Sequence, residues 1–180
     1  MAKYIAFLRA INVGGSKIIK MEDLRRMIAA PGIKNIVTYI QSGNVVFEAK
    51  EADSAAISKK LEKHLEQQLG YKVEIMVRSV AEMQSVLERY PFKGKEQEGT
   101  MQYVSFLSEQ PETSRAEELL SFNSEIDTFV VDGPELYTSV VKNGAKSRFE
   151  PAFIERKLKV LSTTRNMKTV NKMLELATAQ

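Results

Sequence analysis

The stretch FLRAINVGGSKIIKMEDL, from Phe7 to Leu24, contains the junction that decides the fold. An apolar run ends near Ala10, a polar and glycine-rich segment follows, and apolar residues then return at helical spacing. The segment INVGGSK between them has two interpretations. It is either a tight turn from a strand into a helix, or a polar loop in which asparagine, glycine, serine and lysine hold an anion.

The residues around this junction predict six elements in the order β-α-β-β-α-β. Alternating or β-branched runs predict the strands, and apolar residues recurring every three or four positions predict the helices. Gly43 lies in a three-residue connection typical of a hairpin, and Gly70 closes the second helix. The predicted elements are strand 4–10, helix 21–28, strands 35–40 and 44–49, helix 56–69 and strand 72–77. This is the order of the ferredoxin-like, or split βαβ, unit.

The second half of the chain repeats most of this order. Ser79 and Glu82 form a capping box at the start of a helix, and residues 93–100 form a polar linker. The elements predicted after the linker are strand 101–107, helix 111–122, two strands around Asp132-Gly133-Pro134, and helices 151–159 and 166–177. The last strand of the first half has no counterpart here. We therefore predict an α+β fold of two ferredoxin-like halves, residues 1–78 and 79–180, the second incomplete and ending in a helical pair. A single compact unit that joins both halves is the alternative.

The composition of the 180-residue chain excludes several kinds of site. Without cysteine, and with His64 as its one histidine, the chain has no disulfide, no thiolate zinc site and little histidine-based metal or triad chemistry. No cofactor and no metal are predicted. The N-terminal apolar run is short and is interrupted by Arg9, and no segment approaches the length of a membrane span. These features predict a cytoplasmic protein with no membrane partner.

The charged residues are distributed unevenly, although the net charge is only +3. Residues 93–135 contain three basic and ten acidic side chains, whereas residues 142–172 contain nine basic and two acidic ones. The basic segment could steer an anionic partner to the C-terminal part. The interpretation we favour is that the two segments lie side by side and neutralise each other, because surface charge is often incidental.

Several motifs together resemble one bacterial family, catalogued as domain of unknown function 1697. They are FLRAINVGG at 7–15, TYIQSGNVVF at 38–47, NGAKS at 143–147, FIERKL at 153–158 and TTRN at 163–166. The resemblance covers nearly the whole chain. One departure is Met167, where the family pattern usually has tryptophan. The resemblance implies an α+β fold and supplies no reaction.

Chain topology predicts that two polar loops meet. In the β-α-β-β-α-β order the first two strands run parallel, so the loop after the first strand and the hairpin after the second emerge at the same end of the sheet. The candidate ligand-binding residues are therefore Arg9, Asn12, Gly14, Gly15, Ser16, Lys17, Gln41, Ser42 and Asn44.

These residues support two interpretations of equal weight. Glycine N–H groups before a helix can bind an anion, and Lys17 or Arg9 would add a charge-assisted hydrogen bond. Alternatively, the glycines only make the turn, and Asn12, Gln41 and Asn44 satisfy loop backbone groups. The P-loop spacing and the dinucleotide-binding glycine pattern are both absent from the sequence.

The C-terminal helices offer a second candidate site. Arg165, Lys168 and Lys172 recur at helical steps and are candidate phosphate contacts to a nucleic acid. Residues 160–163 would then separate the two helices at a spacing close to that of a helix-turn-helix. We favour the plainer alternative, a solvated face on a helical hairpin.

Three functional hypotheses follow from the sequence. The leading one is a binding module for a phosphate-bearing or other anionic ligand, either a small molecule or nucleic acid. The second is a small-molecule enzyme with a pocket between the two halves. The third is a protein-interaction or structural role. Because Ser42 and Ser147 lack a recognisable activating base, no catalytic residue is predicted and an enzyme is not favoured.

Overall fold

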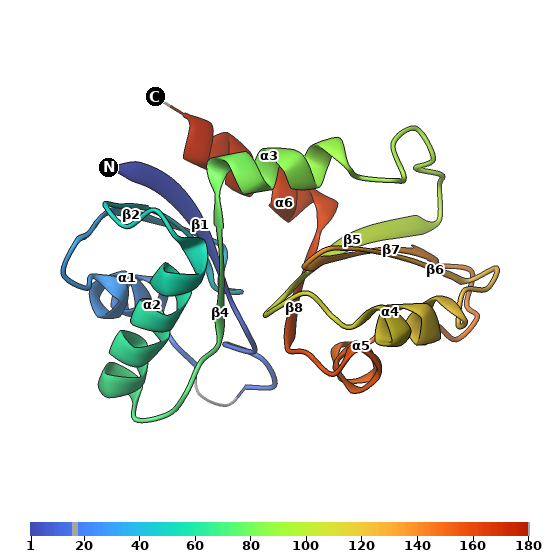
Figure 1. Cartoon of the computed structure of the whole chain (residues 1–180), viewed down its shortest axis with the longest axis horizontal. Coiled ribbons are helices and arrows are strands. Elements are labelled where there is room, and N and C mark those ends of the chain that lie inside the picture. Colours follow the sequence, from blue (N-terminus) through green and yellow to red (C-terminus); the bar gives the residue numbers. More distant parts are fainter. Residues whose placement is uncertain (16–17, 180) are drawn as a thin grey trace. The chain divides into compact units, whose positions relative to one another are not determined.

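The computed structural model describes residues 1–15 and 18–179, which form two compact units. Unit 1 consists of Met1–Ser85 together with Asn171–Gln180, and unit 2 consists of Val86–Val170. Each unit contains one four-stranded antiparallel sheet with two helices on one face (Figure 1). The α+β class is therefore confirmed.

Unit 1 contains the six elements predicted for the first half, in the predicted order. They are β1 (Ala2–Leu8), α1 (Met21–Ile28), β2 (Ile33–Tyr39), β3 (Asn44–Ala49), α2 (Ser54–Leu69) and β4 (Ile75–Ser79). The strand order across the sheet is β2-β3-β1-β4. Strand β1 ends two residues before the predicted end, and Ala10, with φ of 54°, has a left-handed backbone that cannot continue a strand.

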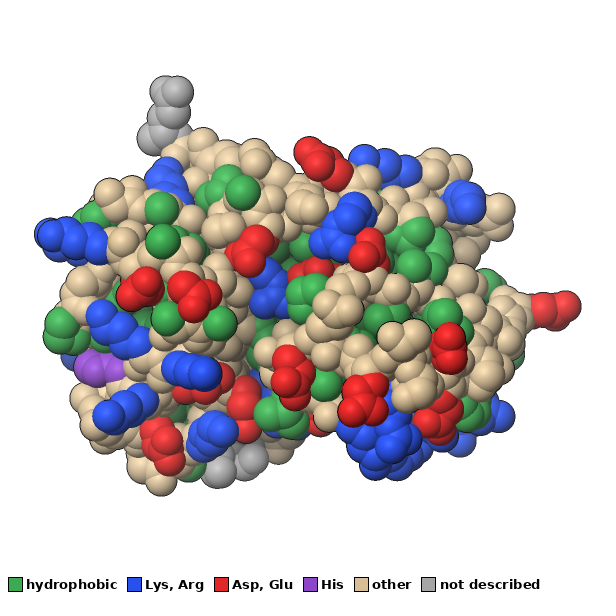
Figure 2. Space-filling view, viewed as in Figure 1, with side chains coloured by type: hydrophobic (Ala, Val, Ile, Leu, Met, Phe, Trp, Pro, Cys, Tyr) green, Lys and Arg blue, Asp and Glu red, His purple; other side chains and the backbone are tan. Residues whose placement is uncertain are grey.

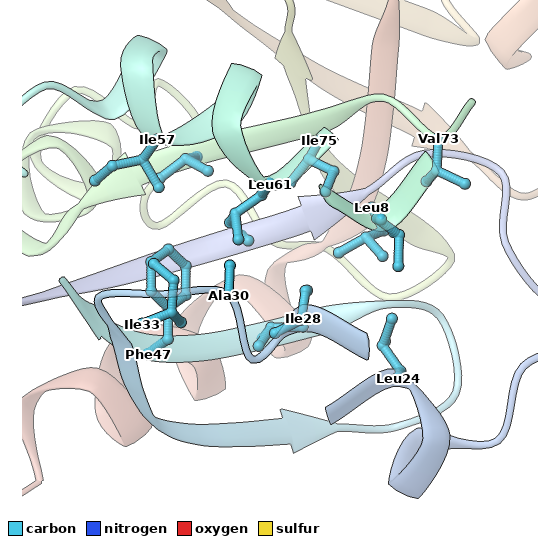
Figure 3. Close-up of a cluster of buried hydrophobic side chains, with 14 of the residues drawn as sticks. Leu8, Leu24, Ile28, Ala30, Ile33, Phe47, Ile57, Leu61, Val73 and Ile75 are labelled. Carbon is cyan, nitrogen blue, oxygen red and sulfur yellow. The ribbon is translucent and has the colours of Figure 1, made fainter. Parts of the chain in front are cut away.

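The core of unit 1 lies between the sheet and its two helices. Alternate residues of β1 point to this side, as the two-residue period of a strand requires, and meet Leu24 and Ile28 of α1 and Leu61 of α2 (Figure 3). All three of these helix side chains are fully buried. Burying one such side chain contributes about 1.5–3 kcal/mol, so this layer holds the loops at the end of the sheet on a rigid base.

Unit 2 has the same architecture. Helix α3 (Val80–Glu88) runs from unit 1 into unit 2. The elements that follow are β5 (Thr100–Leu107), α4 (Thr113–Leu120), β6 (Asp127–Asp132), β7 (Glu135–Val141), α5 (Pro151–Leu158) and β8 (Ser162–Asn166). The last helix, α6 (Met167–Thr178), begins in unit 2 and belongs mostly to unit 1. The strand order is β6-β7-β5-β8, which matches the order in unit 1 position by position.

Strand β8 corrects two predictions. The second half is not short of its last strand, and it does not end in a helical hairpin, because β8 lies between α5 and α6 and pairs with β5 from Leu107↔Ser162 to Tyr103↔Asn166. The sequence Ser-Thr-Thr-Arg-Asn has no apolar alternation, so periodicity did not indicate a strand. Within the sheet the Ser105 and Thr164 hydroxyls lie 2.7 Å apart in a hydrogen bond, which makes a polar strand compatible with a buried position.

The strand registers also show a sequence repeat that local patterns did not indicate. The central strand of unit 1 reads Tyr-Ile-Ala-Phe-Leu at residues 4–8, and that of unit 2 reads Tyr-Val-Ser-Phe-Leu at 103–107. The two stretches have equivalent pairing: the phenylalanine of each faces the first residue of the hairpin's second strand, Asn44 or Glu135. Because register is specified by pairing, this equivalence relates the two units residue by residue.

Within the described part of the chain, none of the helices combines the length and apolar character needed to cross a membrane.

Candidate functional site

The β1–α1 loop and the β2–β3 hairpin meet at one end of the sheet in unit 1, as the topology predicted. Asn12 makes the connection. Its Nδ2 donates to the carbonyl oxygens of Gln41, at 2.7 Å, and Ile19, at 2.9 Å. The N–H of Ile19 in turn donates to Oδ1 of Asn12 at 2.6 Å. One amide side chain therefore closes the first loop on itself and ties it to the hairpin.

Backbone hydrogen bonds hold the same end of the sheet together. The N–H of Leu8 donates to the carbonyl of Gly43 at 2.8 Å, and the N–H of Arg9 donates to the carbonyl of Glu74 at 2.9 Å. A Cβ at Gly43 would lie 2.7 Å from Cδ1 of Ile11 and 2.8 Å from Cβ of Leu8. Glycine is therefore required at position 43 by close packing as well as by its φ of 80°.

Gly14 and Gly15 are required for a different reason. Both have a left-handed backbone, with φ of 71° and 73°, and both are exposed. Among the described residues, a Cβ on either would meet no heavy atom within 4 Å. Their Cβ positions are therefore free of close neighbours among the described residues. We call Asn12, Gly14, Gly15, Gln41 and Ser42 the Asn12 turn cluster.

Two further predicted site residues lie outside the described residues: Ser16 and Lys17. Arg9 lies at the same end of the sheet, and its Nη1 is 3.4 Å from Oε2 of Glu74, with about a quarter of each side chain exposed. Its guanidinium therefore forms an ion pair within the site.

Asn44 has an internal role in the hairpin. It is fully buried, and its Nδ2 donates to the carbonyl of Tyr39 at 3.0 Å and to Oγ of Ser42 at 2.8 Å. Ser42 is half-buried, and Gln41 is exposed. Asn44 thus holds the turn together from its buried side, while Gln41 and Ser42 lie nearer the surface.

Sequence reasoning missed two features of this end of the sheet. Ala10, Asn12 and Ile40 all have a left-handed backbone, with φ between 47° and 55°. Such a backbone is uncommon outside glycine and is an outlier for a β-branched residue such as Ile40. In addition, Val13, Ile18 and Ile40 are exposed. The sequence carried a signal for the second feature, because valine and isoleucine interrupt an otherwise polar and glycine-rich connection.

The predicted basic stripe of Arg165, Lys168 and Lys172 is wrong as a helical face. Arg165 belongs to strand β8, where its Nη1 donates to Oγ1 of Thr163 at 2.7 Å and to the carbonyl of Thr164 at 2.9 Å. Burial lowers the pKa of its guanidinium to about 10. Lys168 is exposed on α6, and Lys172 forms an ion pair with Glu175 at 2.6 Å. A role for these residues as phosphate contacts stays a prediction.

Arg165 has a structural counterpart in unit 1. Arg78 of β4 faces Ile5 of β1, as Arg165 of β8 faces Val104 of β5. Each arginine donates to the carbonyl of the residue before it, at 3.0 Å for Arg78 and 2.9 Å for Arg165. The residue after each arginine, Ser79 or Asn166, caps the helix that follows. The same succession of strand, arginine and helix cap therefore occurs twice in the chain.

The acidic and basic segments of the sequence contact each other within unit 2. Nζ of Lys157 lies 2.9 Å from Oε1 of Glu118, and this hydrogen bond holds the pKa of the Glu118 carboxyl below its ordinary value. Figure 2 shows acidic and basic side chains interspersed over the face formed by unit 2. This ion pair agrees with the interpretation that the acidic and basic segments neutralise each other's charge. Within residues 1–15 and 18–179, no group of three or more histidine, aspartate or glutamate side chains is placed to hold a metal ion.

Comparison with known proteins gives a family and a fold. The family model described as "Protein of unknown function (DUF1697)" matches residues 1–137. A solved structure, "The structure of conserved bacterial protein SP0830 from Streptococcus pneumoniae", is 21% identical, with a TM-score of 0.77 over 98% of each chain. At this identity the likeness concerns the fold alone. None of the curated proteins matches the chain. The match over residues 1–137, together with the motifs at Phe7–Gly15 and Thr38–Phe47, places this chain in the DUF1697 family.

Proposed function

We propose that the Asn12 turn cluster binds a phosphate-bearing or other anionic ligand. The observation that carries this proposal is the clamp made by Asn12, which ties the loop that contains the exposed Gly14-Gly15 turn to the hairpin. Successive N–H groups in such a turn form a concave surface of positive partial charge that suits an anion. Lys17 adds a cationic side chain to the same loop in the sequence.

A comparison of the two units supports the proposal. Unit 2 has the same framework at the equivalent end of its sheet: the N–H of Leu107 donates to the carbonyl of Pro134, and that of Ser108 to the carbonyl of Leu161, each at 2.9 Å. Yet the β5–α4 connection is residues 108–112, whereas the β1–α1 connection is residues 9–20. The fold does not need the longer loop. Loops of this length in compact units are commonly functional.

The finer description of the fold belongs to the same proposal. We infer that both units are ferredoxin-like, since each has the β-α-β-β-α-β order and the same strand order. A cytoplasmic location and a binding rather than catalytic role are also part of the proposal. Nucleic acid as the anion remains one candidate ligand, with Lys168 as a candidate contact on α6.

Thermal unfolding in the presence of pyrophosphate tests the proposal. A ligand at a hundredfold excess over its Kd stabilises the folded state by about 2.7 kcal/mol, which corresponds to a rise in Tm of roughly 5–10 °C for a chain of this size. We expect Lys17→Ala to leave the Tm of the free protein unchanged and to abolish this rise. Lys50→Ala is the matched control, because Lys50 is exposed after β3, at the opposite end of the sheet. Absence of any rise with pyrophosphate, nucleotides and short oligonucleotides would refute the proposal, and an equal loss in both variants would place the site elsewhere.

A further inference from the structure

Exposed aliphatic side chains concentrate on the loops that carry the Asn12 turn cluster. Val13 and Ile18 are each 67% exposed, and Ile40 is 51% exposed. The other exposed large apolar side chains of the described residues are Met1 immediately before β1, Val37 on β2, three residues before Ile40, and Met101 and Leu120 in unit 2. Single exposed apolar side chains are ordinary, but a group of them marks a binding surface.

The hydrogen bonds of Asn12 join the chain neighbours of these three residues. Asn12 bonds to Ile19 and to Gln41, and each aliphatic residue is the immediate neighbour of one of these three joined residues. Val13 follows Asn12, Ile18 precedes Ile19, and Ile40 precedes Gln41. Neighbouring Cα atoms are 3.8 Å apart, so the clamp that orders the turn also holds the aliphatic residues close to it. We call Val13, Ile18 and Ile40 the aliphatic triad.

Folding does not account for the triad. Ile40 has a left-handed backbone, with φ of 47°, which glycine or asparagine would adopt at lower cost than a β-branched side chain. With half of its side chain exposed, it also gains less from burial than the residues of the core. Val13 directly precedes the exposed Gly14-Gly15 turn, so an exposed apolar side chain lies next to the turn proposed to bind the anion.

We propose that the ligand of this site is an organic phosphate whose other part is apolar, an alkyl or aryl phosphate ester rather than inorganic phosphate or a sugar phosphate. This inference rests on the proposed anion-binding function. The phosphate lies on the Gly14-Gly15 turn, and the apolar group covers the aliphatic triad. A sugar would instead place hydroxyl groups against three aliphatic side chains, where they lose hydrogen bonds to water without replacement.

A series of phosphate monoesters tests the inference by isothermal titration of the full chain. The probes are methyl, butyl and hexyl phosphate, each below its micelle concentration, with glucose 6-phosphate and hexanol as controls. Full burial of a methylene group raises affinity about fourfold, so on a partly open surface we expect roughly a twofold gain per methylene along the series. Glucose 6-phosphate should bind no better than methyl phosphate, and hexanol should bind far more weakly than hexyl phosphate.

The decisive variant replaces the triad by polar residues. Val13→Ser, Ile18→Ser and Ile40→Asn together should reduce hexyl phosphate affinity to that of methyl phosphate while leaving methyl phosphate binding unchanged. Asparagine is chosen at position 40 because it tolerates the left-handed backbone. The matched control, Met101→Ser with Leu120→Ser, changes exposed apolar residues of unit 2 and should keep the dependence on chain length.

Each other outcome has a distinct meaning. Equal affinity for all phosphate esters would overturn the inference and leave the proposed function standing. Hexanol binding as tightly as hexyl phosphate would overturn it too, because the surface would then be merely apolar. If no phosphate ester and no pyrophosphate binds, the proposed function itself fails, and this inference fails with it.

Discussion

Glycines at this end of unit 1 serve two different physical purposes. Gly43 has no room for a Cβ, because Ile11 and Leu8 lie within 3 Å of where it would be. Gly14 and Gly15 have room but need a left-handed backbone. The sequence predicted glycine turns at both places, but it did not distinguish steric exclusion from backbone conformation.

Replacing these glycines by alanine should therefore have unequal effects. At Gly43, left-handed strain of about 1–2 kcal/mol adds to overpacking of about 1–3 kcal/mol, so Gly43→Ala should destabilise the fold by roughly 2–5 kcal/mol. At Gly14 the same strain of about 1–2 kcal/mol acts without overpacking, so the loss should be about 1–2 kcal/mol. Urea unfolding of the two variants measures the difference. Equal losses would show that close packing at Gly43 contributes nothing.

Asn12 should matter for its side chain more than for its backbone conformation. Each of its three hydrogen bonds contributes about 0.5–1.5 kcal/mol, so Asn12→Gly, which keeps the left-handed backbone, should cost about 1.5–4.5 kcal/mol. Asn12→Ala should cost about 1 kcal/mol more because of strain. The control is Asn35→Gly, at another left-handed but exposed position, where little change is expected. If both glycine variants prove equally stable by urea unfolding, the clamp does not hold the loops.

At the scale of elements, capping at helix α3 was readable from the sequence, but strand β8 was not. The capping box pairs the N–H of Ser79 with Oε2 of Glu82 at 2.6 Å and the N–H of Glu82 with Oγ of Ser79 at 3.1 Å. Ser79 and Glu82 are three residues apart in the sequence, so a local motif specifies both hydrogen bonds. Strand β8 depends on β5, which lies more than fifty residues earlier in the chain.

The capping box predicts a pH dependence of stability. Burial alone would raise the pKa of the Glu82 carboxyl, but hydrogen bonds from Ser54 and Ser79 outweigh it and hold the pKa below its ordinary value of 4.5. A lowered pKa in the folded state gives stabilisation that is present above the unfolded pKa and is lost as the pH falls through the folded one. Glu82→Gln should therefore cost a few tenths to about 1 kcal/mol at pH 7, the low end of capping effects because Glu82 is exposed.

Urea unfolding at pH 7 and at pH 3 measures this difference, which should shrink at the lower pH. Glu88→Gln on the same helix, also exposed, is the control and should show no such change. A cost for Glu82→Gln that is the same at both pH values would mean that the charge of Glu82 does not stabilise the helix start.

At the scale of the whole molecule, the two units share one architecture but differ in the polar residue at the start of the hairpin's second strand. The central strands have equivalent sequences, at residues 4–8 and 103–107, and the hairpins are tied to them by the same backbone hydrogen bonds. The polar residue at the start of the hairpin's second strand differs, however. In unit 1 it is Asn44, bonded within the hairpin, whereas in unit 2 it is Glu135, whose Oε2 is 3.2 Å from Nη2 of Arg89.

The shared strand order predicts a shared pattern of hydrogen exchange. In each sheet two strands are paired on both sides, β3 and β1 in unit 1 and β7 and β5 in unit 2. Their amides should exchange at least about tenfold more slowly than those of the edge strands, because exchange there requires opening of more structure. Strand β2 should exchange fastest in unit 1, since its register shifts between Lys34 and Val37. Exchange mass spectrometry at peptide resolution checks this, and protection of β2 equal to that of β3 would contradict it.

The sequence by itself determined the six elements of unit 1, the meeting of its two loops and the membership of a family. Periodicity reports which face of an element is buried, and strand direction follows from the order of elements, so both are readable along the chain. Only the tertiary structure decided that Ser162–Asn166 is a strand, that Arg165 is half-buried within it, and that Val13, Ile18 and Ile40 are each exposed. The physical reason is that these features arise from contacts between segments far apart in the sequence, and short polar strands and apolar loop residues carry no local period that reveals their partners.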